Sequence, residues 1–192
     1  MTRGIDLAGF ERKFAAADDP WRCRSSDFEA LKRRRALAGL PLVGSALDVA
    51  CGDGAGTRTL AARALRVDAI DGAEAALASA DRLVGRNPRV RLRLARVPRD
   101  LPHGRWQRIL VSELAYYLAP DEIESLANAL VLRLAPGGEL IAVHHVVRFA
   151  DARTPPCHAV ALLHRHLARQ LGRPVVRSYG RYVVARWCRT RS

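Results

Sequence analysis

The sequence predicts an α/β protein with a doubly wound, mostly parallel sheet of seven strands that ends in an antiparallel hairpin. Three observations predict this fold class. Apolar runs typical of strands alternate with helix-like segments through the middle of the chain, the first of these strands runs into a glycine-rich turn, and two short β-like runs separated by Tyr179-Gly180 close the sequence. Alternating strands and helices favour a parallel sheet with helices on both faces. The 192 residues are expected to form one domain.

The first 40 residues predict two helices. Apolar residues at helical spacing indicate a helix over 6–17. The segment Asp18-Asp19-Pro20-Trp21 ends it. A second helix is expected from Ser26 to about Leu40, because Ser26 and Glu29 have the spacing of a capping box.

The rest of the chain alternates between the two kinds of element. Strands are expected over 46–50, 67–71, 89–94, 106–111, 140–143, 174–178 and 181–187, and helices over 57–65, 73–84, 121–134 and 158–171. The strand over 89–94 alternates polar and apolar residues, which favours a place near the sheet edge. Pro136-Gly137-Gly138 is typical of a sharp turn.

The glycine-rich stretch that follows the first strand is the strongest functional signal. A strand, a turn of small residues and a helix in that order let the backbone approach a polar ligand closely. The spacing Asp48-x-Ala50-x-Gly52-x-Gly54 differs from the GxGxxG of dinucleotide-binding folds, and no Walker lysine and serine follow. Asp71 ends the second strand, where a carboxylate commonly binds a ribose diol.

This stretch resembles the first motif of class I S-adenosylmethionine-dependent methyltransferases. The later segment Ala135-Pro136-Gly137-Gly138 resembles the same family. The resemblance implies the Rossmann-like fold of that family and S-adenosylmethionine as cofactor. It implies that the acidic residue lies near the methionine part and the glycines beneath the ribose. The cofactor-binding residues expected from it are Trp21, Asp48, Ala50, Gly52, Gly54, Asp71, Gly72 and Arg96. For Trp21 the alternative is a hydrophobic anchor of the N-terminal segment.

A narrower resemblance rests on three segments. Asp18-Asp19-Pro20-Trp21, then Phe28-Glu29 with a basic helix, then Ser112-Glu113-Leu114-Ala115-Tyr116-Tyr117-Leu118 are similar to the nodulation protein S type of methyltransferase. Those enzymes N-methylate the free amine of a partly deacetylated chitooligosaccharide. The resemblance covers most of residues 5–150 and implies a small amine, such as an amino sugar, as acceptor. It also implies that residues 1–40 cover the cofactor cleft while residues 45–192 form the sheet and its helices.

Two residues depart from the family pattern. Ala50 stands where many members have glycine. Arg96 stands where the family often has an aspartate for the adenine amino group. Arginine offers donors only, so adenine must be held by backbone groups or stacking, or its affinity is reduced.

Three residues are candidates for the chemistry on the acceptor. An amine must lose a proton before it attacks a methyl group, and a carboxylate or neutral imidazole can take that proton. Glu113 follows a strand that ends near Ser112, so it is expected to bind and deprotonate the amine, with helix capping as the alternative. One of Tyr116 and Tyr117 is expected to line the methyl site and the other to lie in the core, and Tyr116 is taken as the candidate for the site. His144 is the candidate auxiliary base, because alternation sends only one of His144 and His145 to the cleft; the alternative is a structural histidine whose hydrogen bonds are satisfied within the protein.

The charge is unusual but favours no nucleic-acid partner. The formal net charge is +13 and the sequence pI is near 11.0. Such a charge suits nucleic acid or an acidic substrate. However, only Lys13 and Lys32 are lysines among the 32 basic residues, an arginine skew that a GC-rich genome also produces. Aromatic residues make up only 6%, too few for an obvious base-stacking platform.

The sequence also predicts a cytoplasmic protein without a metal or membrane partner. No apolar run reaches the ~20 residues of a membrane span, and no signal-peptide core precedes the first helix. The four cysteines lie far apart, with no zinc-type spacing, and are expected to be free thiols.

Two alternatives to an N-methyltransferase remain. A small-molecule O-methyltransferase would use the same cofactor residues with a different acceptor. A nucleic-acid-binding or scaffold protein on a degenerate methyltransferase fold is the other alternative, suggested by Arg96 and the charge.

Overall fold

The structure is a computed structural model that describes residues 4–191. The chain divides into two compact units. The N-terminal unit is Leu7–Arg96. The C-terminal unit runs from Val97 onward and includes residues 4–6.

The N-terminal unit contains three parallel strands in the order β3-β2-β1. Its elements are α1 (Leu7–Ala16), α2 (Asp27–Leu37), β1 (Val43–Val49), α3 (Ala55–Ala61), β2 (Ala64–Asp71), α4 (Glu74–Val84) and β3 (Val90–Leu94). The register pairs Val49 with Ile70, and Asp71 with Leu94. The carboxyl ends of all three strands therefore meet at one edge, where the glycine turn and Asp71 lie.

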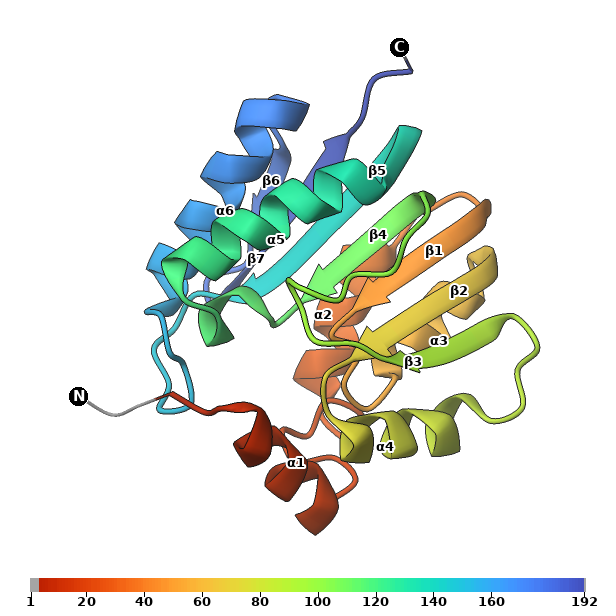
Figure 1. The fold of residues 1–192 in the computed structure, drawn as a ribbon, viewed down its shortest axis with the longest axis vertical. Coiled ribbons are helices and arrows are strands. Elements are labelled where there is room, and N and C mark those ends of the chain that lie inside the picture. Colours follow the sequence, from red (N-terminus) through yellow and green to blue (C-terminus); the bar gives the residue numbers. More distant parts are fainter. Residues whose placement is uncertain (1–3, 192) are drawn as a thin grey trace. The chain divides into compact units, whose positions relative to one another are not determined.

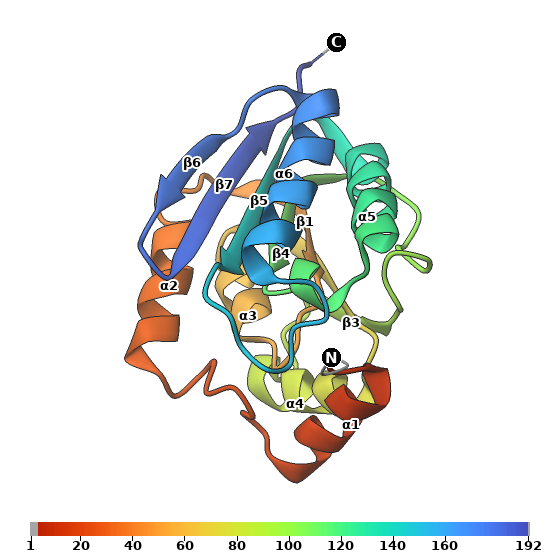
Figure 2. The same ribbon diagram turned by 90° about the vertical axis from the view of Figure 1, so that its left-hand side faces the viewer.

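Helix α1 lies beside α4 in both views (Figures 1 and 2). The apolar side of α1 explains this position. Phe14 is buried against Ala73 and Ala76, and Leu7 and Phe10 pack around them. The helical spacing of the aromatic and aliphatic residues in α1 thus becomes a contact with the helix that follows Asp71.

The C-terminal unit holds four strands in the order β4-β5-β7-β6. Its elements are β4 (Trp106–Ser112), the 3-10 helix η1 (Ala115–Tyr117), α5 (Pro120–Arg133), β5 (Leu134–His145), α6 (Pro156–Leu171), β6 (Val175–Ser178) and β7 (Tyr182–Cys188). Strands β4 and β5 are parallel, whereas β7 is antiparallel to both β5 and β6. Helices α5 and α6 pack side by side (Figure 2). The seven strands and the antiparallel ending agree with the sequence prediction.

Three local expectations were wrong. Strand β2 begins at Ala64, which is fully buried, so the helix expected over 57–65 ends earlier, at Ala61. Ser26 is the N-cap of α2 but makes no side-chain capping bond there; Glu29 pairs instead with Lys32, whose Nζ lies 2.7 Å from Oε2. The third concerns the segment before the fifth strand.

Pro136-Gly137-Gly138 is not a free-standing turn but part of β5, where it forms a bulge. The register with β4 shifts between Trp106 and Arg108, which pair with Leu134 and Glu139 respectively. A Cβ atom on Gly138 would lie 2.8 Å from the carbonyl oxygen of Ala135. The bulge therefore depends on the absence of a side chain at this position.

Within residues 4–191, no helix has both the length and the apolar character needed to cross a membrane. All four cysteines are free thiols, as expected.

Candidate active site

The turn after β1 is built from alternating left-handed residues. Ala50, Gly52 and Gly54 have φ values of 58°, 54° and 81°. A Cβ atom on Gly54 would lie 3.0 Å from Cα and Cβ of Ala80, so the absence of a side chain lets the turn approach α4 closely. Three left-handed residues within five positions give the backbone a tight turn. The methyl group of Ala50 is the only side chain at these three positions.

Asp71 joins the end of β2 to this turn. Its Oδ2 accepts a hydrogen bond from the Gly52 amide at 2.9 Å, and its Oδ1 accepts one from the Ala73 amide at 3.0 Å. Burial raises the pKa of Asp71. Because each carboxylate oxygen has two acceptor positions, Asp71 can hold these amides and also accept hydrogen bonds from a vicinal diol.

Asp48 lies underneath the turn. Its side chain is buried, and Thr57 Oγ1 donates a hydrogen bond to Oδ2 at 2.7 Å. Burial, aided by the nearby Asp71 carboxylate and opposed by the Thr57 hydrogen bond, raises the pKa of Asp48 to about 7. In the structure Asp48 therefore ties β1 to α3.

The segment before α2 contacts the glycine turn through Arg24. The Nε of Arg24 lies 3.4 Å from Asp53 Oδ2, and Asp53 Oδ1 accepts a hydrogen bond from the Ala55 amide at 3.1 Å. Asp19 accepts hydrogen bonds from the amides of Arg24 and Ser25, at 3.1 and 3.0 Å. Sequence reasoning missed Arg24, because an arginine thirty positions before the turn has no spacing signal.

Trp21 anchors the same segment to α1. Its ring lies 5.5 Å from the ring of Phe10 and 5.4 Å from that of Phe14, centroid to centroid. Lys13 Nζ lies 5.1 Å from the centroid of the Trp21 ring. Contacts of this kind hold the segment by packing and by a cation–π interaction.

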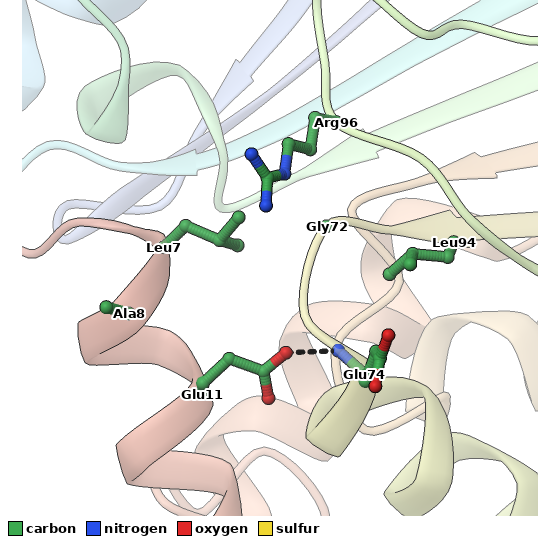
Figure 3. A pocket seen from close by; sticks show the side chains of 7 residues that line it. All are labelled: Leu7, Ala8, Glu11, Gly72, Glu74, Leu94 and Arg96. Atoms are coloured by element: carbon green, nitrogen blue, oxygen red, sulfur yellow. Dashed lines mark hydrogen bonds between the residues drawn. The ribbon is translucent and has the colours of Figure 1, made fainter.

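Gly72 and Arg96 line a pocket in the N-terminal unit (Figure 3). The pocket has a volume of about 350 Å³ and is lined by Leu7, Ala8, Glu11, Gly72, Glu74, Leu94 and Arg96. A Cβ atom on Gly72 would lie 3.2 Å from Leu7 Cδ1 and 3.6 Å from Arg96 Cγ. The glycine thus leaves room for both neighbouring side chains beside the end of β2.

In the C-terminal unit, Glu113 lies at the carboxyl end of β4. It has a left-handed φ of 56°, and its amide donates to the carbonyl oxygen of Val143 at 2.8 Å. Polar groups of Tyr116 and His145 converge on its Oε2. These are the Tyr116 hydroxyl, His145 Nδ1 at 3.1 Å and the His145 amide at 3.3 Å. A non-glycine residue held in this conformation at a strand end is a common feature of functional sites.

The contacts of His144 agree with the alternative of a structural histidine and not with an auxiliary base. Its side chain is fully buried, and Nε2 accepts a hydrogen bond from the Ala115 amide at 3.1 Å. That lone pair cannot also accept a proton from a substrate. Strand alternation does separate the two histidines, but it is His145, 21% exposed, that contacts Glu113.

Tyr116 is buried at the centre of an aromatic cluster. Its ring lies 4.8 Å from that of Tyr117 and 4.9 Å from that of Phe149, centroid to centroid. Its carbonyl oxygen accepts hydrogen bonds from the amides of Arg153 and Thr154, at 2.9 and 3.0 Å. Tyr116 therefore connects Glu113 to the loop before α6.

Residues 46–138 match a family profile described as a methyltransferase domain. The chain contains a methyltransferase domain. It is similar to nodulation protein S of Rhizobium tropici, with 31% identity over 147 residues that cover 74% of this chain and 58% of that protein. It is also similar to nodulation protein S of Sinorhizobium fredii, with 30% identity over 131 residues that cover 66% of this chain and 60% of that protein. The chain thus spans about three fifths of the length of these curated relatives.

Solved structures share the fold of this methyltransferase domain. The N-methyltransferase NodS from Bradyrhizobium japonicum WM9, in complex with S-adenosyl-L-homocysteine, has a TM-score of 0.80 and 22% identity, covering 95% of this chain and 97% of that chain. The DhpI-SAM-HEP complex has a TM-score of 0.76 and 21% identity, covering 95% of each chain. The predicted fold class and the resemblance to nodulation protein S are both confirmed.

Proposed function

We propose that this chain is an S-adenosylmethionine-dependent methyltransferase that N-methylates a small amine, such as an amino sugar or a chitooligosaccharide. The similarity to nodulation protein S supports the reaction class. The observation that carries the cofactor assignment is the bond between Asp71 and the Gly52 amide, which presents a carboxylate beside a side-chain-poor turn. The acceptor assignment depends on Glu113.

The N-terminal unit fits S-adenosylmethionine. Asp71 is placed for the ribose hydroxyls, and the backbone at Gly52 and Gly54 has no Cβ to exclude a ligand. The pocket of about 350 Å³ next to Gly72 has the size of a small-ligand site. When bound, the cofactor supplies a methyl group on a sulfonium, which a nucleophile can displace.

The C-terminal unit supplies a carboxylate for the amine. An ammonium group has no free lone pair, so it must give up a proton before it can act as a nucleophile. Glu113 is assigned as the group that binds the ammonium and accepts that proton. The contacts of Tyr116 and His145 with Oε2 hold the carboxylate in one orientation. His145, partly exposed and in contact with the same oxygen, is assigned to pass the proton to water.

Calorimetric titration with S-adenosylhomocysteine tests the cofactor assignment. We expect the wild-type chain to bind, and Asp71→Ala to weaken binding by at least about tenfold, because a charge-assisted bidentate contact with the ribose is lost. Asp81→Ala, the same change on the exposed side of α4, is the matched control and should leave the affinity unchanged. Equal affinities for wild type and Asp71→Ala would contradict the assignment. An absence of binding to the wild type, with DNA or RNA binding that falls steeply with salt, would instead support the scaffold alternative.

Methyl transfer to amines and hydroxyls, measured side by side, tests the acceptor assignment. We expect turnover with amino sugars, and a loss of about 10²- to 10⁴-fold in kcat for Glu113→Gln, because an amide cannot take the proton. The affinity for S-adenosylhomocysteine should stay the same. Glu124→Gln on the exposed face of α5 is the control. Methylation of hydroxyls alone would remove the N-methyltransferase assignment and leave an O-methyltransferase.

A further inference from the structure

We propose that Arg96 contacts the purine base of the cofactor, and that the pocket therefore binds a 6-oxopurine with an affinity at least equal to that for adenine. This inference rests on the proposed function, because it concerns the same cofactor. It assigns a specificity-determining role to the one cationic side chain among the residues that line the pocket.

The position of the pocket points to the base. Gly72 follows Asp71 directly, and Leu94 pairs with Asp71 across β2 and β3. When Asp71 holds the ribose, the base attached to that ribose therefore lies next to Gly72 and Leu94. Leu7 and Leu94 give the pocket two apolar walls, on opposite sides of the view in Figure 3. Leu94 is 53% exposed, which leaves a large apolar surface for a planar ring to cover.

The charges around the pocket favour a neutral ligand. The amides of Glu74 and Ala75 at the start of α4 donate to the Glu11 carboxylate, at 2.5 and 3.0 Å. That carboxylate already satisfies the positive end of the helix, which would otherwise attract a phosphate. The side chain of Glu74 adds a second negative charge at the pocket. A 2′-phosphate beside Arg96, as in a phosphorylated dinucleotide, would face both carboxylates.

The chemistry of Arg96 sets which base it prefers. Among the residues that the structure describes, no hydrogen bond or ion pair engages its guanidinium, which lies on the side of Leu7 in Figure 3. Arginine has donors and no acceptor. The amino group at position 6 of adenine is also a donor, so only a ring nitrogen can accept from Arg96. A 6-oxopurine offers O6 and N7 side by side, the pair that arginine binds with its two-pronged end.

Glu74 is the group that could oppose this preference. Its carboxylate lines the pocket and can accept a hydrogen bond from an amino group. The proposal states that Arg96 outweighs it. Glu74→Gln should therefore change the relative affinity for the two bases less than any change at Arg96.

The test compares two ligands by calorimetry: S-adenosylhomocysteine and S-inosylhomocysteine, in which oxygen replaces the adenine amino group. The wild-type chain should bind the inosine form with an affinity equal to or higher than that for the adenosine form. Arg96→Asp should shift the ratio of the two dissociation constants by at least about tenfold toward adenosine, since the carboxylate accepts from the amine and repels O6. Arg96→Met keeps an unbranched stem without donors and should weaken the inosine form more than the adenosine form. Arg91→Asp, the same charge change on an exposed residue of β3, should leave the ratio unchanged.

Each result decides the matter. Wild-type binding of the adenosine form that is measurably tighter than binding of the inosine form would overturn the role of Arg96 while the proposed cofactor survives. An unchanged ratio in Arg96→Met, checked for native circular dichroism, would do the same. Failure of the wild type to bind either ligand would overturn the proposed function itself.

Discussion

Among residues 4–191, two non-glycine residues at strand ends have the left-handed conformation, and both belong to the candidate site. Ala50 follows β1 and Glu113 follows β4. For an L-residue this conformation costs roughly 1–2 kcal/mol, because Cβ approaches the following carbonyl oxygen. At Ala50 the methyl group performs no chemistry, whereas at Glu113 the strain aims a carboxylate at Tyr116 and His145.

Ala50→Gly should therefore stabilise the protein. Removal of the strained Cβ outweighs the extra flexibility of glycine in the unfolded chain, by roughly 0.5–1 kcal/mol. Thermal unfolding should show a midpoint higher by about 2 °C. Ala161→Gly, in the exposed interior of α6, is the contrasting control and should lower stability by about 1 kcal/mol. A lower midpoint for Ala50→Gly would show that its methyl group makes a contact worth more than the strain.

Asp48 should make stability fall as the pH rises. Its pKa is raised from an ordinary value of 3.8 to about 7 in the folded state, so the folded chain holds a proton that the unfolded chain releases. That stability is fully present below about pH 4 and is lost as the pH rises through about 7. Urea unfolding of the wild type should give a free energy lower at pH 8 than at pH 5, with roughly 2–3 kcal/mol from Asp48.

Asp48→Asn should flatten this dependence. The pKa values of Asp71 and Asp53 are also raised by burial, so a smaller fall in the same direction should remain in the variant. A slope identical to that of the wild type would mean that Asp48 is already ionised in the folded state at pH 5.

Among the elements, the sequence pattern predicted every α-helix and strand that the structure describes, but it predicted neither the 3-10 helix η1 nor all of the boundaries. The start of β2, where the buried Ala64 is followed by the exposed Leu65, has the composition of a helix end, and only pairing with β1 makes it a strand. The bulge at Ala135–Gly138 contains the residues of a turn, yet the chain continues in the same direction because β4 pairs on both sides of it. The local sequence indicates where a turn is favoured, whereas strand pairing depends on a partner distant in the chain.

Gly138→Ala should destabilise the bulge. The new methyl group would meet the carbonyl oxygen of Ala135 at 2.8 Å and that of Gln107 at 3.1 Å, and both atoms are backbone atoms that cannot move aside cheaply. We expect a loss of roughly 2 kcal/mol or more in urea unfolding. Gly39→Ala is a useful comparison, because that glycine has a left-handed φ of 67° and open space around it. Its loss should be limited to the roughly 1–2 kcal/mol of left-handed strain. Equal losses at the two sites would argue against the packing explanation.

The positions of candidate site residues were predictable where they follow from a place at the end of a strand. Asp71 and Glu113 were chosen as candidates because Asp71 ends β2 and Glu113 follows β4, and ligands of parallel sheets bind at the carboxyl ends of the strands. Alternation separated His144 from His145 but could not say which of them faces Glu113. That choice depends on the register of β5, which the bulge shifts.

At the scale of the whole molecule, a bound cofactor should raise the stability of the chain. A ligand that binds only the folded state adds about 2.7 kcal/mol at a concentration 100 times its dissociation constant. For a chain of 192 residues this corresponds to a rise of roughly 5–10 °C in the thermal midpoint with S-adenosylhomocysteine. The Asp71→Ala variant should show no comparable rise. A rise of equal size in that variant would place the ligand away from Asp71.

The contact between Glu11 and the start of α4 has a consequence for synthesis. Residue 73, the N-cap of α4, is an alanine and has no side chain that could accept from the free amides. The acceptor comes instead from a helix 63 positions earlier. On the ribosome the residues of α1 emerge first, so the acceptor is already present in the nascent chain when the helix that needs it appears. A chain that began at residue 18 would make the same α4 without its acceptor, and the first turn of that helix would open to water.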